Sequence, residues 1–120
     1  MILQLPWPPS LNTYWRHVGH KTLLSAAGRQ YRTDVIAAVL HQYPLHKPLE
    51  SRLSVQITAL PPDRRSRDLD NLLKGPLDAM EHAGVYVNDS QIDDLHIIRG
   101  PRLPGGHLVV FVERIEGGTP

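Results

Sequence analysis

The chain has 120 residues with a formal net charge of +1; 41% of the residues are hydrophobic, and none is Cys. This length fits a single domain over residues 1–120, and the absence of Cys excludes disulfides and zinc sites of the Cys type. No apolar run approaches the roughly 20 residues of a membrane span, and the first residues lack the basic region of a signal peptide. We therefore expect a soluble cytoplasmic domain with no membrane partner.

The charge is unevenly distributed along the chain. Residues 1–67 contain nine Lys or Arg against three acids, whereas residues 68–120 contain four bases and nine acids. Ten of the thirteen bases are Arg, the side chain suited to bidentate contact with phosphate. A basic half beside an acidic half suggests a phosphate-bearing partner and a cation site, although solubility alone also produces such a distribution.

The first half of the chain predicts a strand, a loop and a long helix. Residues 2–5 fit a short strand, which the Pro-rich segment 6–9 ends as a stiff extended loop. We expect residues 11–24 to be irregular and basic. Ser25 then has the character of an N-cap for a helix that ends near Gln42, before Tyr43 and Pro44.

The second half predicts a strand, a helix and a hairpin. Residues 53–60 alternate between apolar and polar side chains, which is typical of a half-buried strand. A helix is expected over residues 71–83 with Gly84 at its C-terminal cap; Pro76 either kinks its first turn or begins the regular helix. Residues 85–94 form a short extended connection, and residues 95–99 and 107–115 form a hairpin.

The predicted order is therefore β-α-β-α-β-β. The natural packing of such a chain is an α+β fold, with two helices on one face of a small mixed four-stranded sheet.

The segment from Asp63 to Asn71 carries the most chemical information. Asp68 and Asp70 are two residues apart, so in an extended segment both carboxylates lie on one side. Carboxylates alone would repel DNA, so beside a segment of arginines suited to phosphate they make chemical sense only around a cation. Magnesium is the obvious candidate because it prefers oxygen ligands and bridges to substrate phosphates, and Lys74 could reach the same phosphate.

A third carboxylate should complete such a site, and we select Asp89, with Asp93 and Asp94 as rivals. Each of the three carboxylates also has a purely structural alternative. Asp70 could cap the helix, Asp68 could pair with a neighbouring Arg, and Asp89 could be a turn residue.

Other chemistries find little support. The seven His residues show no zinc spacing, and the chain has neither a nucleophile motif nor a Gly-rich phosphate loop. Trp7, Tyr14 and Trp15 flank the basic loop; they either stack on bases or pack against the sheet.

Several motifs together resemble the RusA-type Holliday junction resolvases, a family of small prophage-associated endonucleases. The resemblance covers nearly the whole chain. Its marks are Leu5-Pro6-Trp7-Pro8-Pro9-Ser10, Asn12, Tyr14, Arg16-His17, Pro62-Asp63-Arg64-Arg65, Arg67-Asp68-Leu69-Asp70-Asn71, Lys74, Asp78-Ala79, Asp89 and Gln91.

The resemblance implies a homodimer that binds four-way DNA junctions in recombination and repair and makes paired symmetric nicks with Mg²⁺. It implies that Asp68, Asp70 and Asp89 bind the metal and that Lys74 is a catalytic lysine. The stretches implied to contact DNA comprise Ser10, Leu11, Asn12, Thr13, Arg16, Arg64, Arg65, Arg67 and Asn71. The chain departs from the family pattern at Asn88, Ser66 and Pro76, none of which is one of the ligands.

The expected mechanism is metal-assisted hydrolysis of a phosphodiester, with Lys74 either stabilising the pentacovalent state or positioning the attacking water. The alternative is a non-catalytic nucleic-acid-binding protein whose acidic residues are structural. Such a protein would bind a junction equally well in EDTA and never cut it. For the homodimer, the candidate contact surfaces are the apolar face of the first helix (Val35, Ile36, Val39 and Leu40) and the exposed edge of the hairpin.

Overall fold

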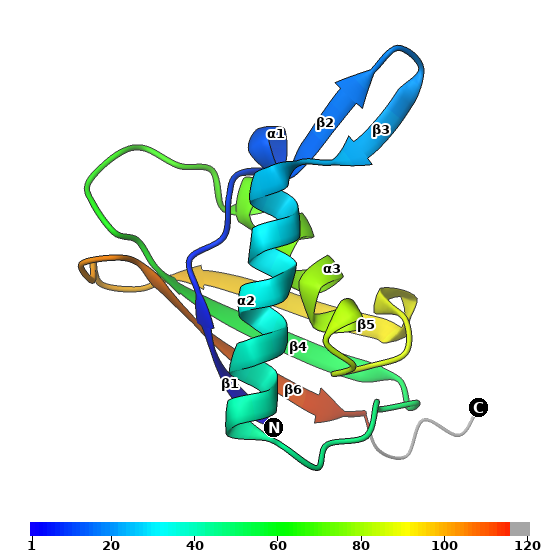
Figure 1. The fold of residues 1–120 in the computed structure, drawn as a ribbon. Helices are drawn as coiled ribbons and strands as arrows, with labels where there is room; N and C mark the ends of the chain where they lie inside the picture. Colours follow the sequence, from blue (N-terminus) through cyan, green and yellow to red (C-terminus); the bar gives the residue numbers. More distant parts are fainter. Residues whose placement is uncertain (116–120) are drawn as a thin grey trace.

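A four-stranded mixed sheet forms the centre of the computed structural model, which describes residues 1–115. The strands lie in the order β1-β6-β4-β5, and β6 is antiparallel to both of its neighbours, while β4 and β5 are parallel (Figure 1). Their bounds are β1 (Ile2–Pro6), β4 (Leu53–Leu60), β5 (Ile92–Arg99) and β6 (His107–Arg114).

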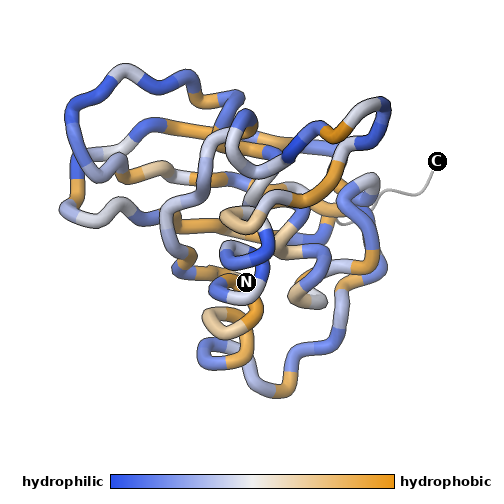
Figure 2. The backbone as a smooth tube through the Cα atoms, turned by 45° about the horizontal axis from the view of Figure 1, so that its top comes forward, coloured by the Kyte–Doolittle hydropathy of each residue, from blue (hydrophilic) through white to orange (hydrophobic). Residues whose placement is uncertain are grey.

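The alternation predicted for the central strand is confirmed. Leu53, Val55, Ile57 and Ala59 of β4 are buried, and the inward residues of β6 lie opposite them, as in the pair Ile57 and Val110. Along the smooth backbone, hydrophobic colour marks the strands and the helix faces, whereas the loop that follows β4 is hydrophilic (Figure 2). Burial of these apolar side chains is the main term that stabilises the sheet against the helices.

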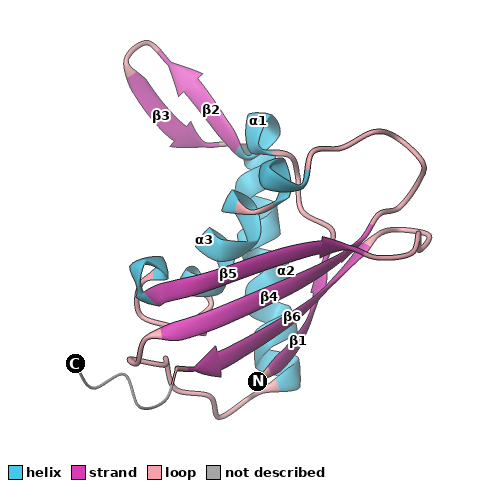
Figure 3. Ribbon diagram, turned by 180° about the vertical axis from the view of Figure 1, so that it is seen from behind, coloured by secondary structure: helices cyan, strands magenta, loops and turns pink. Residues whose placement is uncertain are grey.

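Two helices, α2 (Ala26–Gln42) and α3 (Lys74–His82), cover one face of this sheet, as predicted (Figure 3). The predicted N-cap of α2 is confirmed, because the Ser25 hydroxyl accepts a hydrogen bond of 2.9 Å from the Gly28 amide. The inward face of α2 carries Tyr31, Val35 and Val39, all of which are buried. The predicted α+β class and the arrangement of the helices are thus confirmed.

The predicted C-terminal hairpin is wrong. β5 and β6 do not pair with each other; each pairs with β4, on opposite sides of it. The connection between them passes the end of β4, where the Gly100 amide donates to the Ala59 carbonyl (2.8 Å) and the Leu103 amide to the Pro61 carbonyl (2.9 Å). β4 carries four buried apolar residues, more than β5, and it lies in the interior of the sheet with β5 and β6 on its two sides.

The segment predicted to be irregular is ordered. It contains the short helix α1 (Leu11–Tyr14) and a hairpin of β2 (Trp15–Val18) and β3 (Lys21–Leu24) that projects from the body of the molecule (Figure 1). The two-residue turn uses Gly19 at φ +60, a conformation that favours Gly. The signal in the sequence is Gly19, which lies between two four-residue segments that pair as strands.

The second predicted helix is divided. A 3-10 turn, η1 (Leu69–Leu72), precedes α3, which begins at Lys74 rather than at residue 71 or at Pro76. Pro76 is the third residue of α3, within the first turn, where backbone amides have no intrahelical acceptor, so its missing N–H costs no hydrogen bond there. The predicted C-terminal glycine is confirmed, with Gly84 at φ +77.

The connection from residue 85 to β5 is less extended than predicted. Tyr86 forms one isolated bridge with Leu49, and a second 3-10 turn, η2 (Asp89–Gln91), leads into β5. Asn88 caps this turn through a hydrogen bond that its side chain accepts from the Ser90 amide, while the Gln91 side chain accepts from the Asn88 amide. The turn therefore has a defined geometry, with Asp89 as its first residue.

The two outer edges of the sheet differ. On β1, the Tyr43 hydroxyl bonds both backbone polar groups of Ile2 (3.0 and 2.8 Å), and the Gln42 amide group does the same for Gln4 (2.8 Å each). Within residues 1–115, no strand or side-chain ladder of this kind covers the outer edge of β5. None of the described helices is both long and apolar enough to cross a membrane.

Candidate active site

The loop from Pro61 to Asp68 follows β4 and is held by an internal ion pair. Asp63 accepts hydrogen bonds from the Arg67 guanidinium at 2.7 and 3.1 Å and from the Arg65 amide at 2.9 Å. These bonds lower the pKa of Asp63 to about 2. The Arg67 guanidinium also lies over the Trp7 ring, 5.6 Å from its centroid. Arg67, which the resemblance places among the DNA-contacting residues, thus has intramolecular partners that fix the loop.

Asp68 and Asp70 stand in contrast to Asp63. Both are exposed, and neither carboxylate has a hydrogen bond or an ion pair with any residue of the part of the chain that the structure describes. Asp68 does not cap η1 with its side chain, and the N-cap of α3 is Leu73 rather than Asp70. The structural roles considered for these two carboxylates, a helix cap and an Arg pair, are therefore not observed. The premise of an extended segment holds for Asp68 but not for Asp70, which lies in the 3-10 turn.

Lys74 and Asp89 face each other from two different elements. Lys74 is the first residue of α3, and its Nζ lies 3.9 Å from Oδ2 of Asp89. The backbone amide of Asp89 donates to the Glu81 carboxylate at 2.8 Å, which anchors η2 to α3. The structure thus brings together two of the predicted catalytic residues that are 15 positions apart in the chain.

The rivals for the third carboxylate have other partners. Asp93 pairs with the Arg52 guanidinium, which lies at 2.9 Å from Nε to Oδ2 and lowers the pKa of that carboxyl. Asp94 accepts from Ser54 at 3.2 Å and lies 2.9 Å from Nε2 of His96. These contacts favour Asp89 over both as the residue next to Lys74.

The predicted ligands Asp68, Asp70 and Asp89 offer the carboxylate oxygens that a hard cation prefers, but the three side chains do not form a metal-binding cluster in this structure. Within residues 1–115, no group of three His, Asp or Glu side chains is close enough to hold a metal ion. Asp68 and Asp70 nevertheless supply exposed, unpartnered carboxylate oxygens, which are the ligands that Mg²⁺ prefers.

A pocket of about 340 Å³ connects the two stretches predicted to contact DNA. Ser10 from the first stretch and Asp68 and Asn71 from the second all line it. The Thr13 hydroxyl donates to the Ser10 carbonyl at 3.1 Å and so holds this turn. The predicted residues Leu11, Asn12, Thr13, Arg16, Arg64 and Arg65 are all exposed. Tyr14, by contrast, is fully buried, so it packs in the core rather than stacking on bases.

A polar network behind the site was not predicted. Tyr14 donates a short hydrogen bond to Oδ2 of Asp78, which also accepts one of 2.8 Å from Nε of Arg32. Burial acts to raise the pKa of Asp78, but the bonds from Arg32 and Tyr14 outweigh it and hold the pKa below its usual value. Since Tyr14, Arg32 and Asp78 belong to α1, α2 and α3, this network fixes the positions of all three helices. No local spacing in the sequence signals this network, because its three members come from three different helices.

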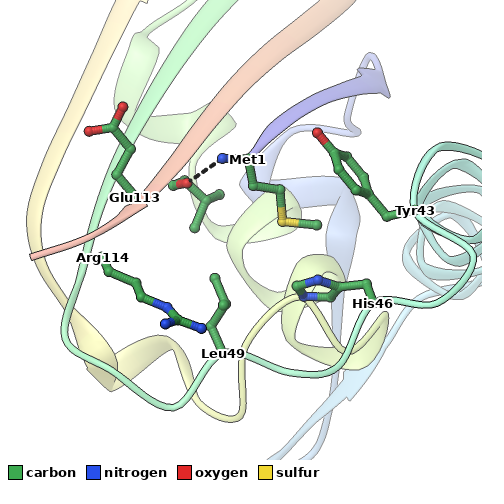
Figure 4. A pocket seen from close by; sticks show the side chains of 7 residues that line it. Met1, Tyr43, His46, Leu49, Glu113 and Arg114 are labelled. Atoms are coloured by element: carbon green, nitrogen blue, oxygen red, sulfur yellow. Dashed lines mark hydrogen bonds between the residues drawn. The ribbon is translucent and has the colours of Figure 1, made fainter.

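A second pocket lies far from these residues. It has a volume of about 680 Å³ and is lined by Met1, Tyr43, His46, Leu49, Val112, Glu113 and Arg114 (Figure 4). Glu113 and Arg114 pair with Ser54 and Leu53 at the start of β4, whereas the carboxylate loop follows the end of that strand. The two pockets are therefore at opposite ends of the sheet.

The chain is similar in sequence to a family of known proteins over most of its length. The family model described as Endodeoxyribonuclease RusA matches residues 6–113. A crossover junction endodeoxyribonuclease of Enterobacteria phage HK97 is 46% identical over 112 residues, which cover 93% of this chain and 92% of the relative. Proteins of the same description from Escherichia coli K12 and Enterobacteria phage 82 are each 41% identical over 110 residues, which cover 92% of this chain and 91% of each relative.

Proposed function

Because the chain belongs to the RusA family of endodeoxyribonucleases, we propose that it is a crossover junction endodeoxyribonuclease that hydrolyses phosphodiester bonds in four-way DNA junctions. The observation that carries this proposal is the 46% identity with the phage HK97 enzyme over 93% of the chain. The reaction belongs to DNA recombination and repair, and its site of action is the cytoplasm.

The proposed metal ligands are Asp68, Asp70 and Asp89, and the proposed ion is Mg²⁺. Two of the three carboxylates have no partner in residues 1–115, and the third has only the 3.9 Å contact with Lys74. When bound, Mg²⁺ lowers the pKa of a coordinated water and neutralises charge that develops on the phosphate. The three carboxylates would hold the ion at the scissile bond.

Lys74 is the proposed catalytic lysine. It lies at the start of α3 with about half of its side chain exposed, so its ammonium can reach a phosphate oxygen in the open site. Its role is to stabilise negative charge on the pentacovalent phosphorus or to orient the water. Exchange of the contact with Asp89 for one with phosphate requires only a rotation of its flexible stem.

We also propose a symmetric homodimer, because two matching cuts across a junction need two sites. The candidate contact surfaces are the apolar face of α2 and, since the predicted hairpin does not form, the outer edge of β5. Val35 and Val39 are buried in the core, which leaves Ile36 and Leu40 as the exposed large apolar side chains of α2. Leu95 and Ile98 of β5 are exposed, one on each face of the sheet, and no strand pairs with the outer edge of β5 within residues 1–115, so β5 is the better contact surface.

A labelled four-way junction incubated with the protein and Mg²⁺ tests the proposed activity. We expect paired nicks in opposed strands, no cutting of a linear duplex of the same sequence, and no cutting in EDTA. The variant Asp34→Asn, which changes an exposed carboxylate on α2, serves as a matched control for substitutions in the site. Binding that is unaffected by EDTA, with no cutting under any condition, would favour the non-catalytic alternative.

A further inference from the structure

An arginine-rich pocket lies directly beside the candidate active site. It has a volume of about 300 Å³, and Trp7 forms part of its wall. Five arginines line it: Arg64, Arg65, Arg67, Arg99 and Arg102. Two of them, Arg99 and Arg102, come from the end of β5 and the connection that follows, which no sequence motif singled out.

The positive charge of this pocket is only partly neutralised. Asp63 is the acidic residue in its wall, and it pairs with Arg67 and, at 3.6 Å, with Arg65. The Arg99 guanidinium donates to the Arg67 carbonyl at 2.5 Å and has no carboxylate partner within residues 1–115. Neither Arg64 nor Arg102 has an ion pair or a side-chain hydrogen bond in the same described range. Three guanidinium groups around one pocket therefore lack a counter-charge, and an anion is the ligand that supplies it.

The backbone holds these arginines in place. β4 and β5 are parallel and end at the same rim, where the Gly100 and Leu103 amides bond to Ala59 and Pro61. Trp7 packs between the two loops, since a Cβ on Gly106 would lie 2.8 Å from its side chain and Arg67 stacks on its ring. The two loops that carry the arginines are thus fixed relative to each other before any ligand binds.

The arginine pocket also continues into the candidate active site. The pocket that contains Ser10, Asp68 and Asn71 shares part of its wall with the arginine pocket, namely Trp7, Ser66, Arg67 and Leu72. A nucleic-acid strand that passes Asp68 is therefore led toward Arg99 and Arg102. Guanidinium groups bind phosphate oxygens through two parallel hydrogen bonds, a geometry that suits a phosphodiester.

We propose that this pocket binds a backbone phosphate of the DNA strand next to the scissile phosphate, and that Arg99 and Arg102 are phosphate-binding residues. The inference rests on the proposed function, because it assumes that the substrate is DNA. It assigns to the end of β5 a direct role in attaching one junction arm.

The test is the salt dependence of junction binding in EDTA, which separates attachment from cutting. The variants are Arg102→Gln, the double variant Arg99→Gln/Arg102→Gln, and Arg114→Gln as the matched control. Arg114 is exposed and lies at the opposite end of the sheet. We expect Arg102→Gln to weaken binding several-fold and to lower the slope of log K against log salt by about one, and the double variant by about two. Arg114→Gln should leave both unchanged.

The thermal unfolding midpoint shows whether a variant binds DNA more weakly because its fold is less stable. Because the Arg102 side chain makes no intramolecular hydrogen bond in the described chain, Arg102→Gln should not move this midpoint. A double variant that binds with the affinity and salt slope of Arg114→Gln would overturn the pocket assignment, even if the unmodified protein cuts junctions normally. Conversely, a loss of binding in the double variant together with an unmodified protein that never cuts would support the pocket and overturn the proposed activity. An unmodified protein that binds no DNA would overturn both.

Discussion

The carboxylate behind the candidate site and those at its rim differ in burial and in hydrogen bonding. Between α1, α2 and α3, Asp78 is largely buried and bonded to both Tyr14 and Arg32. On and beside η1, Asp68 and Asp70 are exposed, and neither carboxylate has a partner within residues 1–115. Removing a partner from a buried, paired charge destabilises a fold, whereas an exposed carboxylate without a partner adds nothing to the fold and is free to bind a ligand.

The strongest test of this comparison is Asp70→Asn. We expect cutting of a four-way junction to fall by about 1000-fold, since the charge stabilisation that a metal ion supplies is worth several kcal/mol. Junction binding should stay the same or become tighter, because a negative charge near phosphate is removed. Single-turnover cutting and gel-shift titration measure the two effects.

Asp68→Asn and Asp89→Asn should lower the rate of cutting to a similar extent, whereas Asp93→Asn should lower it only slightly. Cutting by Asp70→Asn within a few-fold of the unmodified protein would contradict the assignment of the site.

Lys74→Ala should lower the rate of cutting by about 100-fold, the loss typical of one removed donor to a developing negative charge. Its affinity for the junction should change much less, because one exposed ammonium contributes little to total attachment. Single-turnover rates at saturating protein separate rate from affinity. A large loss of affinity with an unchanged rate of the bound complex would assign Lys74 to attachment instead.

Asp78→Asn should lower the free energy of unfolding by about 2 kcal/mol, because hydrogen bonds to a charged, mostly buried group are lost. The pKa of Asp78 is lower in the folded protein than in the unfolded chain, so its contribution is present above about pH 4 and is lost as the pH falls through the folded pKa. Urea unfolding of both proteins between pH 2 and pH 7 should therefore show a difference that shrinks in acid. A difference that is constant over this range would show that the carboxylate charge is not responsible.

Arg64→Ala should have the smallest effect, a loss of a few-fold in junction affinity and about one unit of salt slope. Arg67→Ala provides the contrast, because it also removes the ion pair with Asp63 and the contact with Trp7. It should weaken binding and lower the thermal unfolding midpoint as well. Equal midpoints for the two variants would mean that the internal pair does not hold the loop.

Most elements of the fold could be predicted from the sequence. β4 and α2 were predicted accurately because their patterns are long and uninterrupted, and Ser25 marks where α2 begins. The membership in the RusA family, inferred from short motifs, is confirmed. The partner of each C-terminal strand was not predictable in the same way, because two neighbouring strands with a short loop usually pair with each other. Here the more buried β4 takes both of them as neighbours.

The sequence indicates the residue types of the candidate site but not their partners within the protein. The spacing of Asp68 and Asp70 indicated paired carboxylates, yet nothing local shows that Asp63 neutralises Arg67 or that Asp78 joins three helices. Arg99 and Arg102 could not be predicted as members of this site, because no motif in the sequence includes them. Only the parallel pairing of β4 and β5 brings them next to Arg64 and Arg67.

The bonds from Gln42 and Tyr43 to β1 limit how far copies of this protein can associate. A strand adds to a sheet only where backbone N–H and C=O groups point outward unbonded, and on β1 those of Ile2 and Gln4 are already occupied. Among residues 1–115, β5 is then the edge at which the sheet can grow. A contact between two β5 strands consumes that edge in both copies at once. In a dimer formed through two β5 strands, extension of this sheet would stop at eight strands and two chains, and a fibre could not propagate through it.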